Sequence, residues 1–128
     1  MNTRTSITLA IVAGFGLGGL TVHTLHAQAK PPAFTVVEID VHDLKGYEKD
    51  YAPKARELIK AKGGKLIAVS NNVVAIEGQG AKRLAIQQWA SIEAAKGWAG
   101  SKEYAENRKV GNKYAKFRIL AVEGVPQQ

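Results

Sequence analysis

Four short stretches of the chain are predicted to be β-strands, and two of them, 34–41 and 84–89, show the period of two of a half-buried strand. In the first stretch, 34–41, β-branched residues dominate and bulky apolar residues occur on both sides. The alternation places Thr35, Val37, Ile39 and Val41 on one side, and Phe34, Val36, Glu38 and Asp40 on the other. The other strands are predicted at 65–70, 82–90 and 117–122. Residues 73–77 are predicted to extend the second strand, either as a bent continuation or as a short partner, after a turn or bulge at Asn71-Asn72.

Between these strands, apolar residues recur at every third or fourth position, which predicts amphipathic helices. The first helix runs from Leu44 to Lys62, with Asp43 as its N-cap residue and Gly63-Gly64 as its stop. Its apolar stripe consists of Leu44, Tyr47, Tyr51, Ala55, Leu58 and Ile59. Pro53 interrupts this helix, because proline lacks an N–H group and clashes with the preceding turn. We therefore expect a kink or two abutting helices near Tyr51.

The second helix is predicted from Ile92 to about Ala115. Ser91 fits its N-cap, where a hydroxyl accepts a hydrogen bond from an unpaired backbone N–H, and Gly100-Ser101 marks a break and a second cap. The resulting order is βαββαβ, the ferredoxin-like arrangement of the α+β class, with one antiparallel sheet and both helices on one face. The helix-free face would then need cover, and we expect it from a second copy of the chain in a homodimer.

The amino-terminal part of the chain differs in composition from the rest. Arg4 is the only charged residue among the first 29, an apolar run follows at 7–22, and Ala27-Gln28-Ala29 fits a small-residue cleavage site. These features describe a secretory signal peptide, so we predict a signal peptide at 1–29, one domain at 30–128 and a periplasmic or secreted product. The alternative is an uncleaved anchor. The run is short for a spanning helix, which needs about 20 apolar residues, so we expect no stable membrane insertion after cleavage.

The overall charge and the cysteine count narrow the classes of partner. The chain has 128 residues and a formal net charge of +7, and it contains no cysteine. An excess of positive charge can indicate nucleic acid, a membrane surface or an acidic ligand. Here basic and acidic residues are interleaved through both predicted helices, which is typical of solvated helix faces, so we expect no nucleic-acid partner. The lack of cysteine excludes a disulfide, a thiol nucleophile and a thiolate metal site.

One ordered set of residues extends over the whole predicted domain: Asp43, Tyr47, Tyr51, Gly63-Gly64-Lys65-Leu66, Glu77-Gly78, Gln88-Trp89, Ser91, Glu93-Ala94-Ala95, Trp98, Ser101, Glu103-Tyr104, Arg108 and Val122-Glu123-Gly124. In this set the chain resembles the family called domain of unknown function 1330, of the dimeric α/β-barrel superfamily. The resemblance implies a ferredoxin-like subunit whose sheet packs against that of a second subunit. It implies no single activity, since the superfamily includes cofactor-independent monooxygenases, small isomerases, haem enzymes and stress proteins. The chain departs from the family pattern around Gly111, where an arginine is often found, and Arg108 is either its replacement or unrelated to it.

Three residues near the end of the first strand are candidate acids or bases: His42, Asp40 and Glu38. His42 is the only histidine outside the first 29 residues, and histidine changes charge near neutral pH. Asp40 and Glu38 stand where a strand interior would have apolar residues, and a buried carboxylate is a good acid or base. The alternatives are an exposed loop histidine and carboxylates in salt bridges at the rim of the dimer. One histidine and scattered carboxylates make a poor ligand set, so we expect no metal and no other cofactor.

Aromatic residues gather on the helix faces that are expected to look at the sheet. With a strand-end tryptophan and one cation they would line a pocket for a small molecule: Tyr47, Tyr51, Trp89, Trp98, Tyr104 and Arg108. Alternatively, these aromatics are simply core. The sequence leaves three functions open. They are a small-molecule-binding protein, a cofactor-independent monooxygenase or isomerase acting on a small aromatic or enolic substrate, and a structural or interaction protein without a pocket.

Overall fold

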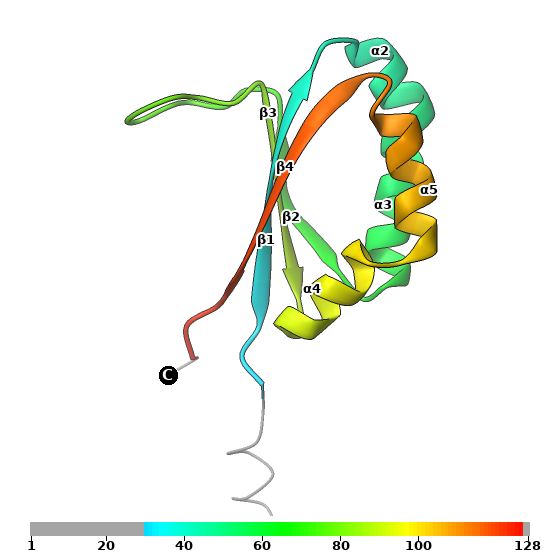
Figure 1. The fold of residues 1–128 in the computed structure, drawn as a ribbon. Coiled ribbons are helices and arrows are strands. Elements are labelled where there is room, and N and C mark those ends of the chain that lie inside the picture. Colours follow the sequence, from blue (N-terminus) through cyan, green and yellow to red (C-terminus); the bar gives the residue numbers. More distant parts are fainter. Residues whose placement is uncertain (1–29, 127–128) are drawn as a thin grey trace, which may run out of the picture. The chain divides into compact units, whose positions relative to one another are not determined.

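In the computed structural model, which describes residues 30–126, four strands form one antiparallel sheet (Figure 1). The strands are β1 (Ala33–Val41), β2 (Lys65–Ser70), β3 (Arg83–Trp89) and β4 (Ala115–Glu123). Their order across the sheet is β2-β3-β1-β4, so β1 pairs with both β3 and β4. The signal peptide predicted at 1–29, and the alternative anchor, lie outside the described residues.

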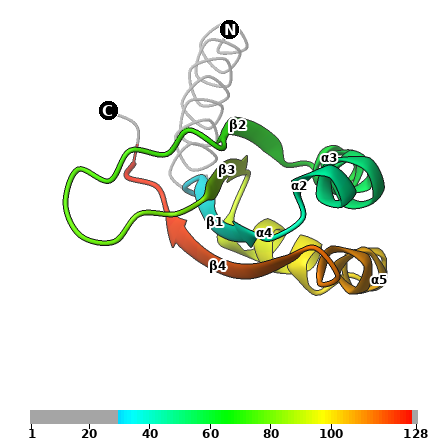
Figure 2. The same ribbon diagram turned by 90° about the horizontal axis from the view of Figure 1, so that it is seen from above.

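Five helical segments connect the strands: α2 (Leu44–Gly46), the π-helix η1 (Tyr47–Tyr51), α3 (Ala52–Ala61), α4 (Ile92–Ala99) and α5 (Lys102–Gly111). All of them lie on the same side of the sheet, as Figures 1 and 2 show from two directions. This arrangement confirms the predicted ferredoxin-like α+β fold. In the part of the chain that the structure describes, no helix is both long and apolar enough to cross a membrane.

The predicted interruption of the first helix near Tyr51 is confirmed. Pro53 stands in the first turn of α3, where its missing N–H group would have no helical partner in any case. The turn before it widens into η1, and the backbone N–H of Ala52 donates to the carbonyl of Tyr47, five residues back. π-helical turns of this kind occur frequently at functional sites. Both tyrosines of η1 are buried against the sheet.

Three predicted details are wrong. Residues 73–77 form no strand within the described chain; the segment 71–82 is a long loop that projects past the helix-free face of the sheet, away from any strand with which it could pair (Figures 1 and 2). The second helix ends at Gly111 rather than near Ala115, because Ala115 already pairs with Val41 in the sheet. Leu44, assigned to the apolar stripe, is 43% exposed because it lies in the first short turn.

The alternation predicted for β1 and β3 positions the core. Val37, Ile39 and Ala85 point toward the helices and are buried, and Trp89 at the end of β3 is only 1% exposed. Trp89 packs on Gly64 so closely that a Cβ atom at that glycine would lie 2.6 Å from the indole ring. Glycine is therefore required there by the close approach of the indole ring.

The helix-free face of the sheet carries apolar residues near one end and charges near the other. The strand pairing puts six apolar side chains on this face: Phe34, Val36, Leu84, Ile86, Leu120 and Val122. Leu120 and Val122 are 50% and 58% exposed. The loop 71–82 adds two more exposed apolar residues, Val74 and Ile76. The apolar residues predicted on both sides of the first strand are thus present, and one set is uncovered in the single chain.

Candidate functional site

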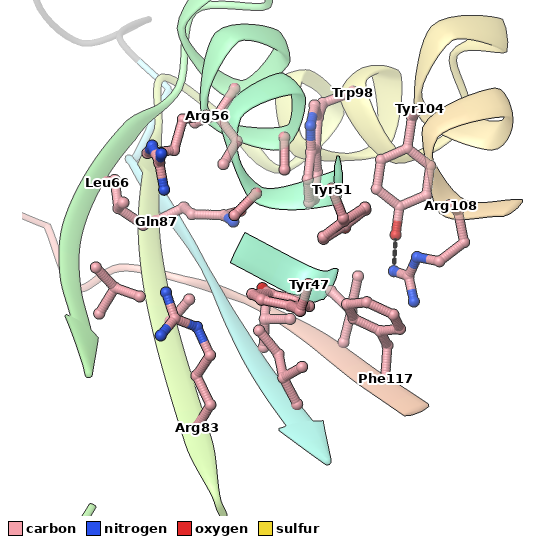
Figure 3. Close-up of a pocket in the computed structure, with 18 residues that line it drawn as sticks. Tyr47, Tyr51, Arg56, Leu66, Arg83, Gln87, Trp98, Tyr104, Arg108 and Phe117 are labelled. Carbon is pink, nitrogen blue, oxygen red and sulfur yellow. Dashed lines mark hydrogen bonds between the residues drawn. The ribbon is translucent and has the colours of Figure 1, made fainter. Parts of the chain in front are cut away.

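A cavity of about 60 Å³ lies between the helices and the sheet (Figure 3). This is room for several water molecules or a small organic group, since one water needs about 10–15 Å³ by the same measure. Its walls are mainly apolar and aromatic. They are formed by Val37, Ile39, Tyr47, Tyr51, Ala52, Ala55, Arg56, Ile59, Leu66, Val69, Arg83, Ala85, Gln87, Trp98, Tyr104, Arg108, Phe117 and Ile119.

Five of the six residues predicted to bind a ligand line this cavity: Tyr47, Tyr51, Trp98, Tyr104 and Arg108. The structure places the sixth, Trp89, behind Trp98, with their ring centroids 5.1 Å apart. Its indole N–H donates to the hydroxyl of Thr35 at 3.1 Å, and that hydroxyl donates to Gln87 at 2.6 Å. Trp89 is thus part of the core that supports the cavity wall, because β3 ends beneath α4 and buries it there.

The aromatic rings of the walls form two contacting sets, Tyr47, Tyr51 and Phe117 in one and Trp98 and Tyr104 in the other. The ring centroids of Tyr47 and Tyr51 are 5.2 Å apart, and those of Tyr51 and Phe117 are 5.3 Å apart. Trp98 meets Tyr104 edge to face at 4.8 Å. Aromatic pairs at these separations contribute stability beyond the area that they bury, so the walls are fixed in place without a ligand.

Sequence reasoning missed three polar residues of the cavity. Arg83 and Gln87 share the buried side of β3 with Ala85, so the strand alternation alone could have identified them. Arg56 stands on α3 and is exposed, which puts it at the rim. Phe117 was predicted only as a strand residue, and its position beneath Tyr51 follows from the register of β4.

The guanidinium groups of Arg83 and Arg108 lie against aromatic rings of the walls. The Cζ atom of Arg83 is 5.3 Å from the centroid of Tyr47, and that of Arg108 is 3.7 Å from the centroid of Phe117. Arg108 also donates from Nη2 to the hydroxyl of Tyr104, as the dashed line in Figure 3 marks. Stacking on ring faces attracts the cation and limits its motion, so both charges are held beside the cavity.

The buried tyrosines are neutral at physiological pH. Burial raises the pKa of Tyr47, and the positive charge of Arg83 offsets only part of the rise. Burial raises the pKa of Tyr51 much further above its ordinary value, with partial compensation by Arg108. Tyr47 and Tyr51 are therefore suited to donate or accept hydrogen bonds, and not to act as bases.

The raised pKa of Tyr51 predicts a loss of stability in alkali. A group whose pKa is higher in the folded state stabilises the fold below its unfolded pKa of about 10, and this contribution is lost as the pH rises above that value. One such group changes the unfolding free energy by at most about 1.4 kcal/mol per pH unit. We expect Tyr51→Phe to have a shallower decline than the wild type in urea unfolding measured from pH 9 to 12. Equal slopes in the two proteins would contradict this assignment.

The three candidate acids and bases lie away from the cavity. Glu38 and Asp40 point to the helix-free face, where Arg118 pairs with Glu38 at 3.1 Å and Lys82 pairs with Asp40 at 2.9 Å. The hydrogen bond and charge of Lys82 lower the pKa of Asp40, which favours its ionised form. His42 is exposed at the end of β1. The structure thus brings the carboxylates into ion pairs, and it does not bring these three residues together with the aromatic walls.

Metal ligands are not gathered in the described part of the chain. Among residues 30–126, no group of three histidine, cysteine, aspartate or glutamate side chains is placed to hold a metal ion. The cavity itself offers nitrogen donors from arginine, glutamine and tryptophan, and hydroxyl groups from tyrosine. Protonated guanidinium and indole N–H groups have no lone pair to give to a metal, so this wall is suited to an acceptor ligand instead.

The element order, sheet order and helix layer define a ferredoxin-like α+β protein, and known structures with this fold are similar to it. Protein RPA0582 of Rhodopseudomonas palustris is 12% identical, with a TM-score of 0.58, covering 83% of this chain and 90% of that one. SnoaB, a cofactor-independent oxygenase from Streptomyces nogalater, is 10% identical, with a TM-score of 0.54, covering 76% and 96%. The Arabidopsis thaliana protein At3g17210 is 15% identical, with a TM-score of 0.56, covering 78% and 94%.

The chain belongs to the DUF1330 family, a domain of unknown function, whose model matches residues 32–125. This confirms the family resemblance noted in the sequence. A comparison with curated protein sequences finds no match. At identities of 10–15% the structural likeness establishes the fold alone, so the function has to be argued from the cavity.

Proposed function

We propose that this protein binds a small molecule in the cavity between the sheet and the helices. The observation that carries the proposal is the cavity itself, which has mainly apolar, aromatic walls and a few convergent polar groups. This composition is typical of small-molecule sites. The predicted alternative of fully packed aromatics without a pocket has less support, because the aromatic rings surround open space.

A thermal-shift screen of the protein against a small-molecule library tests the proposal. A ligand that binds only the folded state raises the melting temperature by mass action, and about 100 times its Kd adds about 2.7 kcal/mol. Because Trp98 lines the cavity, we expect the same ligands to change tryptophan emission. Silence across a broad library would favour the structural or interaction protein.

A cofactor-independent monooxygenase or isomerase remains the second candidate. Its support is the fold shared with SnoaB, which is an argument from likeness only. The cavity offers such chemistry no carboxylate and no histidine among the described residues, and Tyr47 and Tyr51 are neutral. His42, Asp40 and Glu38 would have to act at a different place, so binding is the better supported function.

We also propose that the protein is a homodimer formed through the helix-free sheet face, with the loop 71–82 reaching over the partner. The six apolar residues on this face and the exposed Val74 and Ile76 support the proposal, since contiguous apolar surface marks an association site. We expect Leu120→Glu to convert a dimer into a monomer in light scattering after size exclusion. Ala105→Glu, an exposed change on α5, is the control and should leave the mass unchanged. A Leu120→Glu protein that stays dimeric would contradict this interface.

Export to the periplasm or medium is proposed from the pattern of residues 1–29 alone. Cell fractionation with mass spectrometry of the amino terminus tests it. A mature chain that begins near Ala27 or Ala29 is expected, and a full-length cytoplasmic chain would contradict it.

A further inference from the structure

Three buried N–H groups on the cavity walls lack an acceptor in the protein. They are Nε of Arg83, Nε1 of Trp98 and Nε of Arg108, and none has a hydrogen-bond partner among residues 30–126. All three side chains line the same cavity, and they come from β3, α4 and α5. Trp98 is only 4% exposed. By contrast, the indole of Trp89, outside the cavity, donates to Thr35.

Leaving such groups unpaired is costly, because a buried donor without a partner costs about 1–3 kcal/mol. Most buried polar groups in proteins are paired, so three exceptions around one cavity need a common explanation. They indicate that an occupant of the cavity supplies hydrogen-bond acceptors. Water could do so in the empty protein, and a ligand with oxygen acceptors would replace it.

The charged side chains around the cavity indicate the sign of the ligand's charge. Arg56, Arg83 and Arg108 line it, while no aspartate or glutamate does so among the described residues. The acceptors that Arg83 and Arg108 do have are the amide oxygen of Asn71 and the hydroxyl of Tyr104, which are neutral. Guanidinium groups stay protonated in proteins, so their charges are not balanced within the cavity.

The two stacked guanidiniums approach from different ends. Arg83 stands on β3, and Arg108 lies on the ring of Phe117 from β4. β1 lies between β3 and β4 in the sheet. β3 and β4 are therefore two strand spacings, or about 10 Å, apart. Figure 3 shows Tyr47 and Tyr51 between the two arginines. A ligand lying on these tyrosines would meet a cation at each end.

We propose, resting on the proposed binding function, that the ligand is a small planar organic anion with oxygen acceptors at both ends. One of these acceptors is a carboxylate. It accepts charge-assisted hydrogen bonds from a guanidinium, and such bonds are about twice as strong as neutral ones. The flat body of the ligand lies against the aromatic walls of Tyr47, Tyr51 and Phe117. The indole N–H of Trp98 donates to it from α4.

Calorimetric titration with 4-hydroxybenzoate, benzoate and benzamide tests this proposal, because benzamide matches benzoate in shape and lacks the charge. We expect benzoate to bind at least about tenfold more tightly than benzamide, because only benzoate offers a charged acceptor to the guanidinium. We expect 4-hydroxybenzoate to bind more tightly than benzoate, because it also has an oxygen at its other end. Benzamide binding as well as benzoate would overturn the anion proposal and leave small-molecule binding intact. Failure of all three to bind would overturn it too, while the library screen decides the binding function separately.

Substitutions of the two arginines test whether these side chains bind the anion. Arg83→Gln and Arg108→Gln should each weaken binding of 4-hydroxybenzoate, which has an oxygen at each end, at least about tenfold. Lys109→Gln, the neighbouring exposed cation on α5, is the matched control and should bind 4-hydroxybenzoate as the wild type does. If Arg108→Gln fails to fold, as judged by circular dichroism, Arg83→Gln carries the test. Unchanged 4-hydroxybenzoate affinity in a folded Arg83→Gln protein would overturn the role of Arg83.

Discussion

Replacing Trp89 with alanine is expected to destabilise the domain by about 3–5 kcal/mol, the range for a large aromatic side chain deleted from a core. Trp89 is 1% exposed and packs on Gly64 and Trp98. The substitution also removes the donor to Thr35 at 3.1 Å. Urea unfolding followed by circular dichroism measures the change. For a domain whose unfolding free energy is about 5 kcal/mol, the low end of the usual range, this loss would remove most of the stability.

Trp89→Phe is the matched control for this substitution. It keeps a buried ring but loses the indole N–H, so we expect a smaller loss than for Trp89→Ala. The ligand affinity of Trp89→Phe should stay close to that of the wild type, because Trp89 lies outside the cavity lining. A Trp89→Ala protein within about 1 kcal/mol of the wild type would contradict its assignment as a central core residue.

Replacing Gly111 with alanine is expected to close the cavity. A Cβ atom at this buried glycine would lie 2.8 Å from Cδ2 and Cε2 of Tyr51 and 3.0 Å from Cζ of Phe117. Overpacking of this kind typically costs about 1–3 kcal/mol. The ring of Tyr51 has to move, and the cavity is the space next to it. We therefore expect a loss of stability together with at least a tenfold loss of ligand affinity, measured by unfolding and by calorimetry.

Gly97→Ala is the control for this prediction. Gly97 lies in α4, and a Cβ atom there would meet nothing within 4 Å. Alanine is favoured over glycine inside a helix, so this change should stabilise the protein by about 0.5–1 kcal/mol and leave binding unchanged. If Gly111→Ala behaves like Gly97→Ala, the close packing of Tyr51 on α5 is not what shapes the cavity.

The local signals in the sequence predicted the frame of the fold well. The hydroxyl of Ser91 accepts a hydrogen bond from the backbone N–H of Ala94 and caps the start of α4. The hydroxyl of Ser101 accepts one from the backbone N–H of Tyr104 and caps the start of α5, after the predicted break. The alternation of β1 correctly separated Val37 and Ile39 from Glu38. These features depend on neighbours in the chain and on a period of two, so the sequence alone contains them.

The cavity could be predicted only in part. Helical spacing placed Tyr47 and Tyr51 toward the sheet, but the π-helical turn that holds them depends on how the chain adapts before Pro53. Arg83 falls within the strand predicted at 82–90. Its position against Tyr47 depends on packing between β3 and η1, which no local pattern encodes. The same holds for the loop 71–82, where Val73 to Glu77 have the composition of a strand but lie beyond any pairing strand.

The indole N–H signals of the two tryptophans in a ¹H–¹⁵N NMR titration test the central claim most directly. Trp98 lines the cavity with an unpaired N–H, while the N–H of Trp89 already donates to Thr35. With benzoate, or with a ligand from the thermal-shift screen, we predict a saturable shift of the Trp98 signal. The Trp89 signal should move much less. Saturable binding that leaves the Trp98 signal in place would put the ligand elsewhere and contradict a binding site between the sheet and the helices.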